Sequence, residues 1–223
     1  MKRDATRRER EGPAASYALG MTPDPAQDLY EAQRLLAAGD ASAAASLLRA
    51  VIARGHLRPG LEADARYLLG HALGASGDRD GMAAEWLEVL RLDAASVAAS
   101  AEPLMALEEF ETVAEAALGE LPQELLDQLN AVAIMIADRP SPELVADGLD
   151  PRILGLYHGV PMTRRSVSFG APWADTIHLF RANLERVSPT REVLLERIRV
   201  VVLHETAHYF GYTEGQLRSM GLA

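Results

Sequence analysis

The residues best suited to chemistry lie close to the C-terminus, in the segment His204-Glu205-Thr206-Ala207-His208. The two histidines are four positions apart, so on a helix both imidazoles lie on one face and can bind the same metal ion. Glu205 lies at the edge of that face, where its carboxylate can take a proton from a metal-bound water. The pattern therefore predicts metal-assisted hydrolysis, with Glu205 as the catalytic base.

A hydrolytic metal site of this kind also needs a third protein ligand and one open position for water. Glu214 is the only acidic residue among the fifteen that follow His208. Gly211 would let the chain leave the helix and turn back toward the metal. The predicted metal ligands are therefore His204, His208 and Glu214. Two alternatives stay open at this point: a carboxylate from upstream, such as Asp175, or a solvated or N-capping role for Glu214.

The elements that must position these side chains follow from the surrounding pattern. The run from Val193 to Leu203 is strongly apolar, which predicts a long helix through the core. Ser188 and Pro189 are suited to be its N-cap and first-turn proline, and Gly211 is suited to its end. A short last helix is predicted from about Glu214 to Met220.

Three segments upstream predict a small sheet against the metal-binding helix. Residues 130–137 are expected as a buried strand, 153–160 as a strand or turn, and 175–182 as a half-buried strand. The stretches 140–151 and 162–173 are expected as loops. An extended substrate could pair with the edge of the 175–182 strand.

The N-terminal half has a helical pattern with an internal repeat. Gly39-Asp40 aligns with Gly77-Asp78 at a shift of 38 residues, and the small residue Ala32 aligns with Gly70. Each copy predicts two helices joined by a short turn, which resembles the tetratricopeptide repeat of about 34 residues. The resemblance implies a groove for a peptide or protein partner. The alternative is a helical cap packed on the metal domain. Residues 100–129 continue the helical pattern, with a separate helix predicted over 121–129.

Composition limits the class of protein. The chain of 223 residues has a net charge of −10 and no cysteine. The negative charge argues against a nucleic-acid-binding surface, and the lack of thiols leaves nitrogen and oxygen as metal ligands. No apolar run suits a membrane span or a signal peptide, so a cytoplasmic protein is expected. The predicted division is a flexible tail at 1–22, a helical repeat-like module at 23–118 and an α+β domain at 119–223.

Residues 121–222 resemble a family of small bacterial zinc metallopeptidases with a minimal zincin-like fold. The shared motifs are Leu154-Gly155-Leu156-Tyr157-His158-Gly159-Val160-Pro161, Arg164 or Arg165, Asp175-Thr176-Ile177, His204 to Gly211, and Gln216-Leu217. The family usually has aspartate at the position of Glu214, so the glutamate is a mild departure. The resemblance implies a zincin fold, a Zn²⁺ cofactor and a peptide or protein substrate. The N-terminal helical half lies outside the family's minimal unit.

On this interpretation, Glu205 passes the proton of the activated water to the leaving amine after attack on a peptide carbonyl. Three side chains could assist at the developing oxyanion, namely Tyr157, Arg164 and Arg165. His178 is expected at the surface and Met220 in the core.

Two other functions stay open. In the first, the helical repeats form a protein-binding module and the metal site is structural or vestigial. In the second, a metal hydrolase acts on a substrate other than a peptide, such as a small amide. For such a hydrolase, the negative net charge disfavours a nucleic acid as the substrate but does not exclude a small amide.

Overall fold

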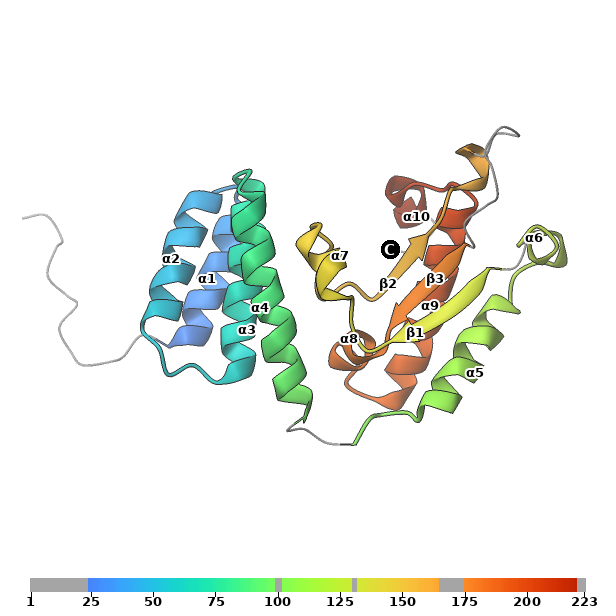
Figure 1. Cartoon of the computed structure of the whole chain (residues 1–223), viewed down its shortest axis with the longest axis horizontal. Helices are drawn as coiled ribbons and strands as arrows, with labels where there is room; N and C mark the ends of the chain where they lie inside the picture. The colour runs from blue at the N-terminus through green and yellow to red at the C-terminus, as the bar shows by residue number, and fades with distance from the viewer. Residues whose placement is uncertain (1–23, 99–101, 130–131, 165–174, 220–223) are drawn as a thin grey trace, which may run out of the picture.

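The protein has an α+β architecture with a helical part and a sheet-containing part (Figure 1). A computed structural model describes residues 24–98, 102–129, 132–164 and 175–219. The helical part consists of α1 (Pro25–Ala37), α2 (Ala41–Ala53), α3 (Pro59–Ala75) and α4 (Arg79–Ala98). The predicted α+β fold class is confirmed.

The two turns of the predicted repeat have the same local structure. Gly39 and Gly77 both adopt left-handed backbone angles, with φ of 81° and 83°, which glycine adopts without steric cost. The side chains of Asp40 and Asp78 each accept a hydrogen bond from the backbone amide three positions on, at 3.0 and 2.9 Å, as N-capping aspartates do. Both hairpins are therefore encoded by the same Gly-Asp pair, while assignment to the tetratricopeptide class stays a prediction.

The second part is built on a three-stranded sheet among the described residues. Its strands are β1 (Ala133–Ala137), β2 (Gly155–His158) and β3 (Thr176–Phe180), in the order β1-β3-β2. β1 runs parallel to β3 and β2 runs antiparallel to it. β3 is therefore central, so the prediction that a substrate pairs with the edge of 175–182 is wrong. β2 lies at an edge of the sheet instead.

The long helix α9 (Arg191–Tyr209) packs across this sheet. Fully buried apolar side chains of both elements form the core between them: Ile177, Leu179, Leu194, Ile198 and Val202. Helix α5 (Leu107–Leu118) packs on α9 as well and contributes Phe110 to the same core. The boundary predicted at residue 118 stays a prediction, although α5 shares its core with the sheet.

Helix α9 begins two residues later than predicted. Its N-cap is Thr190, whose side chain accepts a hydrogen bond from the Val193 amide. Ser188, the predicted cap, is buried and donates its hydroxyl to the Leu184 carbonyl at 2.7 Å. That bond satisfies the end of the preceding helix, so Ser188 is not the cap of α9.

Two helices lie where other structure is predicted. Helix α7 (Pro142–Ala146) forms inside the predicted loop 140–151, with Ser141 as its N-cap and a proline in its first turn. This pair favours helix initiation. Helix α8 (Arg181–Arg186) replaces the end of the predicted strand 175–182, because β3 ends at Phe180.

The remaining elements are short. Helix α6 (Gln123–Leu126) covers only part of the helix predicted at 121–129. A 3₁₀ turn, η1 (Met162–Arg164), follows β2. Helix α10 (Glu214–Ser219) lies at its predicted position, and its predicted last residue, Met220, is outside the described residues.

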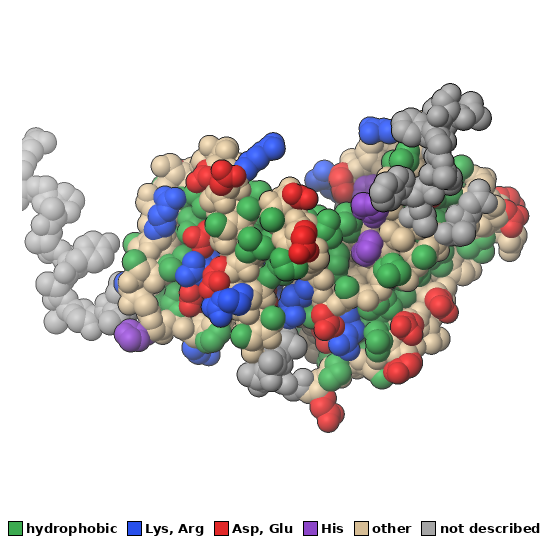
Figure 2. Space-filling model, in the orientation of Figure 1, with side chains coloured by type: hydrophobic (Ala, Val, Ile, Leu, Met, Phe, Trp, Pro, Cys, Tyr) green, Lys and Arg blue, Asp and Glu red, His purple; other side chains and the backbone are tan. Residues whose placement is uncertain are grey.

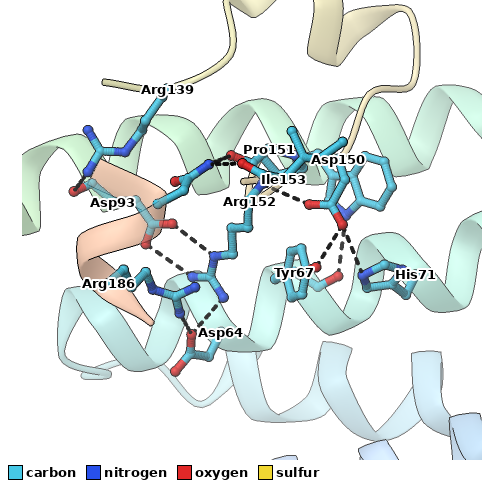
Figure 3. Close-up of polar contacts among 12 residues, drawn as sticks. Asp64, Tyr67, His71, Asp93, Arg139, Asp150, Pro151, Arg152, Ile153 and Arg186 are labelled. Atoms are coloured by element: carbon cyan, nitrogen blue, oxygen red, sulfur yellow. Dashed lines mark hydrogen bonds and ion pairs between the residues drawn. The ribbon is translucent and has the colours of Figure 1, made fainter. Parts of the chain in front are cut away.

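A cluster of charged side chains joins α3 and α4 to the segment before β2 (Figure 3). The side chain of Arg152 is 7% exposed and donates to both carboxylate oxygens of Asp93, at 2.9 and 3.0 Å. It also donates to Asp64 at 2.8 Å, and its guanidinium lies 4.6 Å from the centre of the Tyr67 ring. Arg186 of α8 donates to the same Asp64 at 2.7 Å. The two parts are thus joined by a shared network of ion pairs.

The same junction fixes the backbone that leads into β2. The Asn183 amide donates to the carbonyls of Pro151 and Ile153, at 2.9 and 2.8 Å. Asp150 accepts a hydrogen bond from the Tyr67 hydroxyl of α3 at 2.8 Å. Residues 150–153 are therefore held from both parts of the molecule (Figure 3).

On the face shown in Figure 2, acidic and basic side chains lie interspersed over both parts of the molecule. Within the residues that the structure covers, no helix combines the length and apolar character that a membrane crossing requires.

Candidate metal centre

Three potential ligand atoms converge at the end of α9. The Nε2 atoms of His204 and His208 are 3.1 Å apart. Glu214 Oε1 lies 3.1 Å from the His208 nitrogen and 3.4 Å from the His204 nitrogen. Donors placed tetrahedrally at about 2.0–2.1 Å from a zinc ion are about 3.3 Å from one another. The three atoms therefore have the spacing of three corners of a tetrahedral metal site.

The turn after α9 brings Glu214 to the histidines. Gly211 adopts a φ of 90°, which a residue with a side chain rarely adopts. Its amide donates to the His208 carbonyl at 2.9 Å, which closes the helix. Glu214 then begins α10, which lies beside the end of α9 (Figure 1). The predicted role of Gly211 in ending the helix is confirmed.

A hydrogen bond sets the tautomer of one histidine. His208 Nδ1 lies 3.0 Å from the carbonyl oxygen of Tyr212. Because a carbonyl can only accept, Nδ1 donates to it, so in the neutral imidazole Nε2 is the nitrogen with the free lone pair. This is the tautomer in which Nε2 can bind a metal ion.

Glu205 lies beside the cluster and is buried, with 7% of its surface exposed. Its Oε2 accepts a hydrogen bond from the Tyr157 amide of β2 at 2.7 Å. Burial raises the pKa of Glu205, and the bond from the Tyr157 amide acts in the opposite direction. The carboxylate is therefore held in a fixed position with its proton affinity increased.

Gly155 of β2 makes room for this carboxylate, a role that the sequence analysis missed. A Cβ atom at position 155 would lie 3.1 Å from Glu205 Oε1 and 2.5 Å from Val201 Cγ1. The shared motif contains Gly155, but only the contact between β2 and α9 shows why a side chain is excluded there.

Gly155→Ala is expected to lower the free energy of unfolding by about 1–3 kcal/mol, because the added methyl group overpacks the contact with α9. Urea denaturation measures the change. Gly60→Ala in α3 is the matched control, since no atom lies within 4 Å of a Cβ at that position. Equal denaturation midpoints for the two variants would contradict the proposed close packing.

Asp175, the alternative third ligand, is placed elsewhere. Its carboxylate accepts a hydrogen bond from the Tyr157 hydroxyl at 2.7 Å. Within the described residues, the only group of three or more acidic or histidine side chains with ligand atoms within 4.8 Å of one another is His204, His208 and Glu214. The Tyr157 hydroxyl, predicted at the oxyanion, is directed to Asp175.

The remaining residues singled out in the sequence differ in how close they lie to the candidate metal centre. Arg164 lines the cavity at the site, while Arg165 and Met220 lie outside the described residues. His178 is half-buried on β3, where burial and then the charge of His158 lower its pKa. It is not part of the ligand cluster.

A cavity of about 990 Å³ surrounds the cluster. Its walls come from the segment 153–157, from η1, from one face of α9 and from residues 211–214. The ligand atoms and Glu205 are therefore reached from a space large enough for several residues of a peptide.

Residues 129–222 match a family model described as zincin-like metallopeptidase. No curated protein matches the sequence. The matched segment contains β1, β2, β3, α9 and all four residues of the predicted site, and it excludes helices α1 to α6. The resemblance predicted from the motifs is confirmed for residues 129–222, which match the model of this family.

Proposed function

We propose that the protein is a zinc-dependent metallopeptidase, with His204, His208 and Glu214 as its metal ligands. The observation that carries the proposal is the triangle of donor atoms with edges of 3.1, 3.1 and 3.4 Å. Two imidazoles and one carboxylate are a set that zinc accepts in hydrolytic sites. The family match adds the class of reaction, which is hydrolysis of peptide bonds.

Glu205 is the proposed catalytic base. When bound, zinc would lower the pKa of a water and polarise the substrate carbonyl. Glu205 would hold the proton released from the water and deliver it to the leaving amine. The bond from the Tyr157 amide orients the carboxylate, and burial raises its pKa, which favours acceptance of the proton.

The edge strand β2 is the proposed platform for an extended substrate. The Leu154 carbonyl accepts a hydrogen bond from the Phe180 amide of β3. Since backbone groups alternate in direction along a strand, those of Gly155 lie on the opposite side, which is the side on which the Tyr157 amide donates to Glu205. An extended peptide that lies along this side would place its backbone next to Glu205.

Protein purified without added metal is expected to contain close to one zinc ion per chain by elemental analysis. His208→Ala and Glu214→Ala should each lower zinc affinity by at least about 100-fold, because removal of a ligand costs more than loss of an outer-shell partner. His178→Ala is the matched control, since His178 lies outside the cluster. Zinc affinity that is unchanged in the Glu214 variant would exclude that residue as a ligand.

A further inference from the structure

One half-buried charged side chain in the cavity wall has no hydrogen-bond partner among the residues that the structure describes. Arg197 of α9 is half-buried and lines the cavity. Its Nε atom is buried without a hydrogen-bond partner. The other half-buried arginines of the described chain all donate to protein oxygens, as Arg66, Arg139, Arg152, Arg181 and Arg199 do. Arg197 is therefore an exception within the described residues.

No described residue pairs with Arg197, and the sequence of the two undescribed segments after residue 164, 165–174 and 220–223, contains no acidic side chain. Glu196, the neighbour of Arg197, lies 3.5 Å from Arg199, and its side chain is 65% exposed. A partly desolvated guanidinium without an acid is costly, so a carboxylate from outside the chain would be favoured at this position.

Arg197 lies on the same face of α9 as the metal-binding histidines. It precedes His204 by seven residues, which corresponds to about 10 Å along a helix. An extended peptide advances about 3.3 Å per residue, so this distance corresponds to about three substrate residues. Arg164 of η1 lines the same cavity and is exposed. The remaining acids of the wall, Glu205 and Glu214, belong to the proposed catalytic site.

We propose that Arg197 binds a substrate carboxylate about three residues from the scissile bond. The enzyme would then select acidic peptides, although its own net charge is −10. A guanidinium can bind a carboxylate through two parallel hydrogen bonds, which gives geometric specificity as well as attraction. The inference rests on the proposed peptidase function, because it names the substrate class of that site.

Quenched fluorescent peptides test the proposal. A mixed peptide library first locates the cleaved bond by mass spectrometry. Peptides with Glu or Gln three residues from that bond, on either side, are then compared with their C-termini amidated. On one side of the bond, the Glu peptide is expected to have a kcat/KM about 10–100-fold higher, as expected for hydrogen bonds between charged groups.

The matched variants are Arg197→Gln and Arg199→Gln. Arg197→Gln should bring the ratio between the Glu and Gln peptides close to one, through a loss on the Glu peptide. Arg199→Gln should keep the ratio, because its guanidinium is paired with Glu120 at 2.6 Å. A preference for Glu that persists in Arg197→Gln would overturn the proposal.

A third peptide distinguishes binding of an acidic side chain from binding of the substrate's C-terminal carboxylate. It carries Gln at the same place and ends there with a free C-terminal carboxylate. Preference for this peptide over its amide, lost in Arg197→Gln, would assign a terminal carboxylate and release of short C-terminal peptides. Preference for the internal Glu assigns an acidic side chain. Equal kcat/KM for all peptides would overturn the proposal.

A binding measurement keeps this inference separate from the peptidase proposal. The same peptides are titrated against zinc-loaded Glu205→Gln protein by fluorescence anisotropy, where no cleavage is needed. The Glu peptide or the free acid should bind about 10-fold more tightly than its neutral partner, and Arg197→Gln in the same background should remove the difference. Binding with this difference but without cleavage in the parent protein would refute the peptidase alone. Cleavage by the parent protein, with equal affinity for the acidic and neutral peptides, would refute the carboxylate site alone.

Discussion

Glu205→Gln is expected to lower kcat for peptide hydrolysis by about 10²–10⁴-fold and to leave zinc content and KM nearly unchanged. The glutamine carbonyl can still accept the hydrogen bond from the Tyr157 amide, which Glu205 now accepts at 2.7 Å. The side chain would therefore keep its position, but it could no longer take a proton from water. The loss would fall on the chemical step, since neither the ligand cluster nor the cavity wall is changed.

The measurement combines steady-state kinetics with elemental analysis of the same preparations. Glu192→Gln is the control, because this glutamate lies on an exposed turn at the start of α9, away from the cavity. It should keep kcat within about 3-fold, as surface substitutions usually have small effects. Equal kcat in Glu205→Gln and the parent protein would show that another group accepts the proton.

The same variant separates the peptidase from the alternative of a repeat-based binding module. If the metal site were structural or vestigial, the parent protein would not cleave peptides, and partner binding would not depend on Glu205. If the protein is a peptidase, hydrolysis depends on Glu205 while folding does not. Thermal denaturation of the variant, compared with its kinetics, provides this distinction.

The convergence of His204, His208 and Glu214 could be predicted because its determinants are local. His204 and His208 share a helix face at any position of that helix in the fold. Gly211 and Glu214 follow within six residues of the second histidine, so the turn between them decides where the carboxylate lies. Short sequence separation leaves few alternatives for such a group, and the structure brings the three ligand atoms within 4.8 Å of one another.

Strand order could not be predicted in the same way. β3 has an alternating pattern of burial, but such a pattern shows which side chains face the core and not which neighbours its two edges have. β3 pairs with β1 and with β2, which come from segments separated by helix α7. The alternation in β3 therefore does not show that this strand is central and that β2 lies at an edge.

Contacts between distant segments were also missed. Gly155 is required by Glu205, which lies 50 positions later in the sequence. Arg152 binds Asp64 and Asp93, from which it is separated by 88 and 59 positions. Nothing in the local sequence marks these pairs, because arginine in a polar segment is usually solvated. The ion pairs of Arg152 are buried only because α3 and α4 pack against the sheet-containing part of the molecule.

Arg152→Met is expected to lower the free energy of unfolding by about 3–5 kcal/mol, because it leaves the buried carboxylate of Asp93 without a partner. The Asp93 side chain is 10% exposed, so water cannot replace the guanidinium fully. Urea denaturation gives the free energy. Arg91→Met is the control: Arg91 pairs with Glu88 on the exposed side of α4, so this variant should be about as stable as the parent protein.

A second substitution tests whether the unpaired charge is the cause. Asp93→Asn combined with Arg152→Met removes the buried carboxylate as well, so the double variant should recover part of the stability lost in Arg152→Met. Because residues 150–153 lead directly into β2, the single variant should also lower kcat/KM for peptides. A double variant no more stable than Arg152→Met would show that packing of the long side chain on Tyr67, and not its charge, holds the two parts of the molecule together.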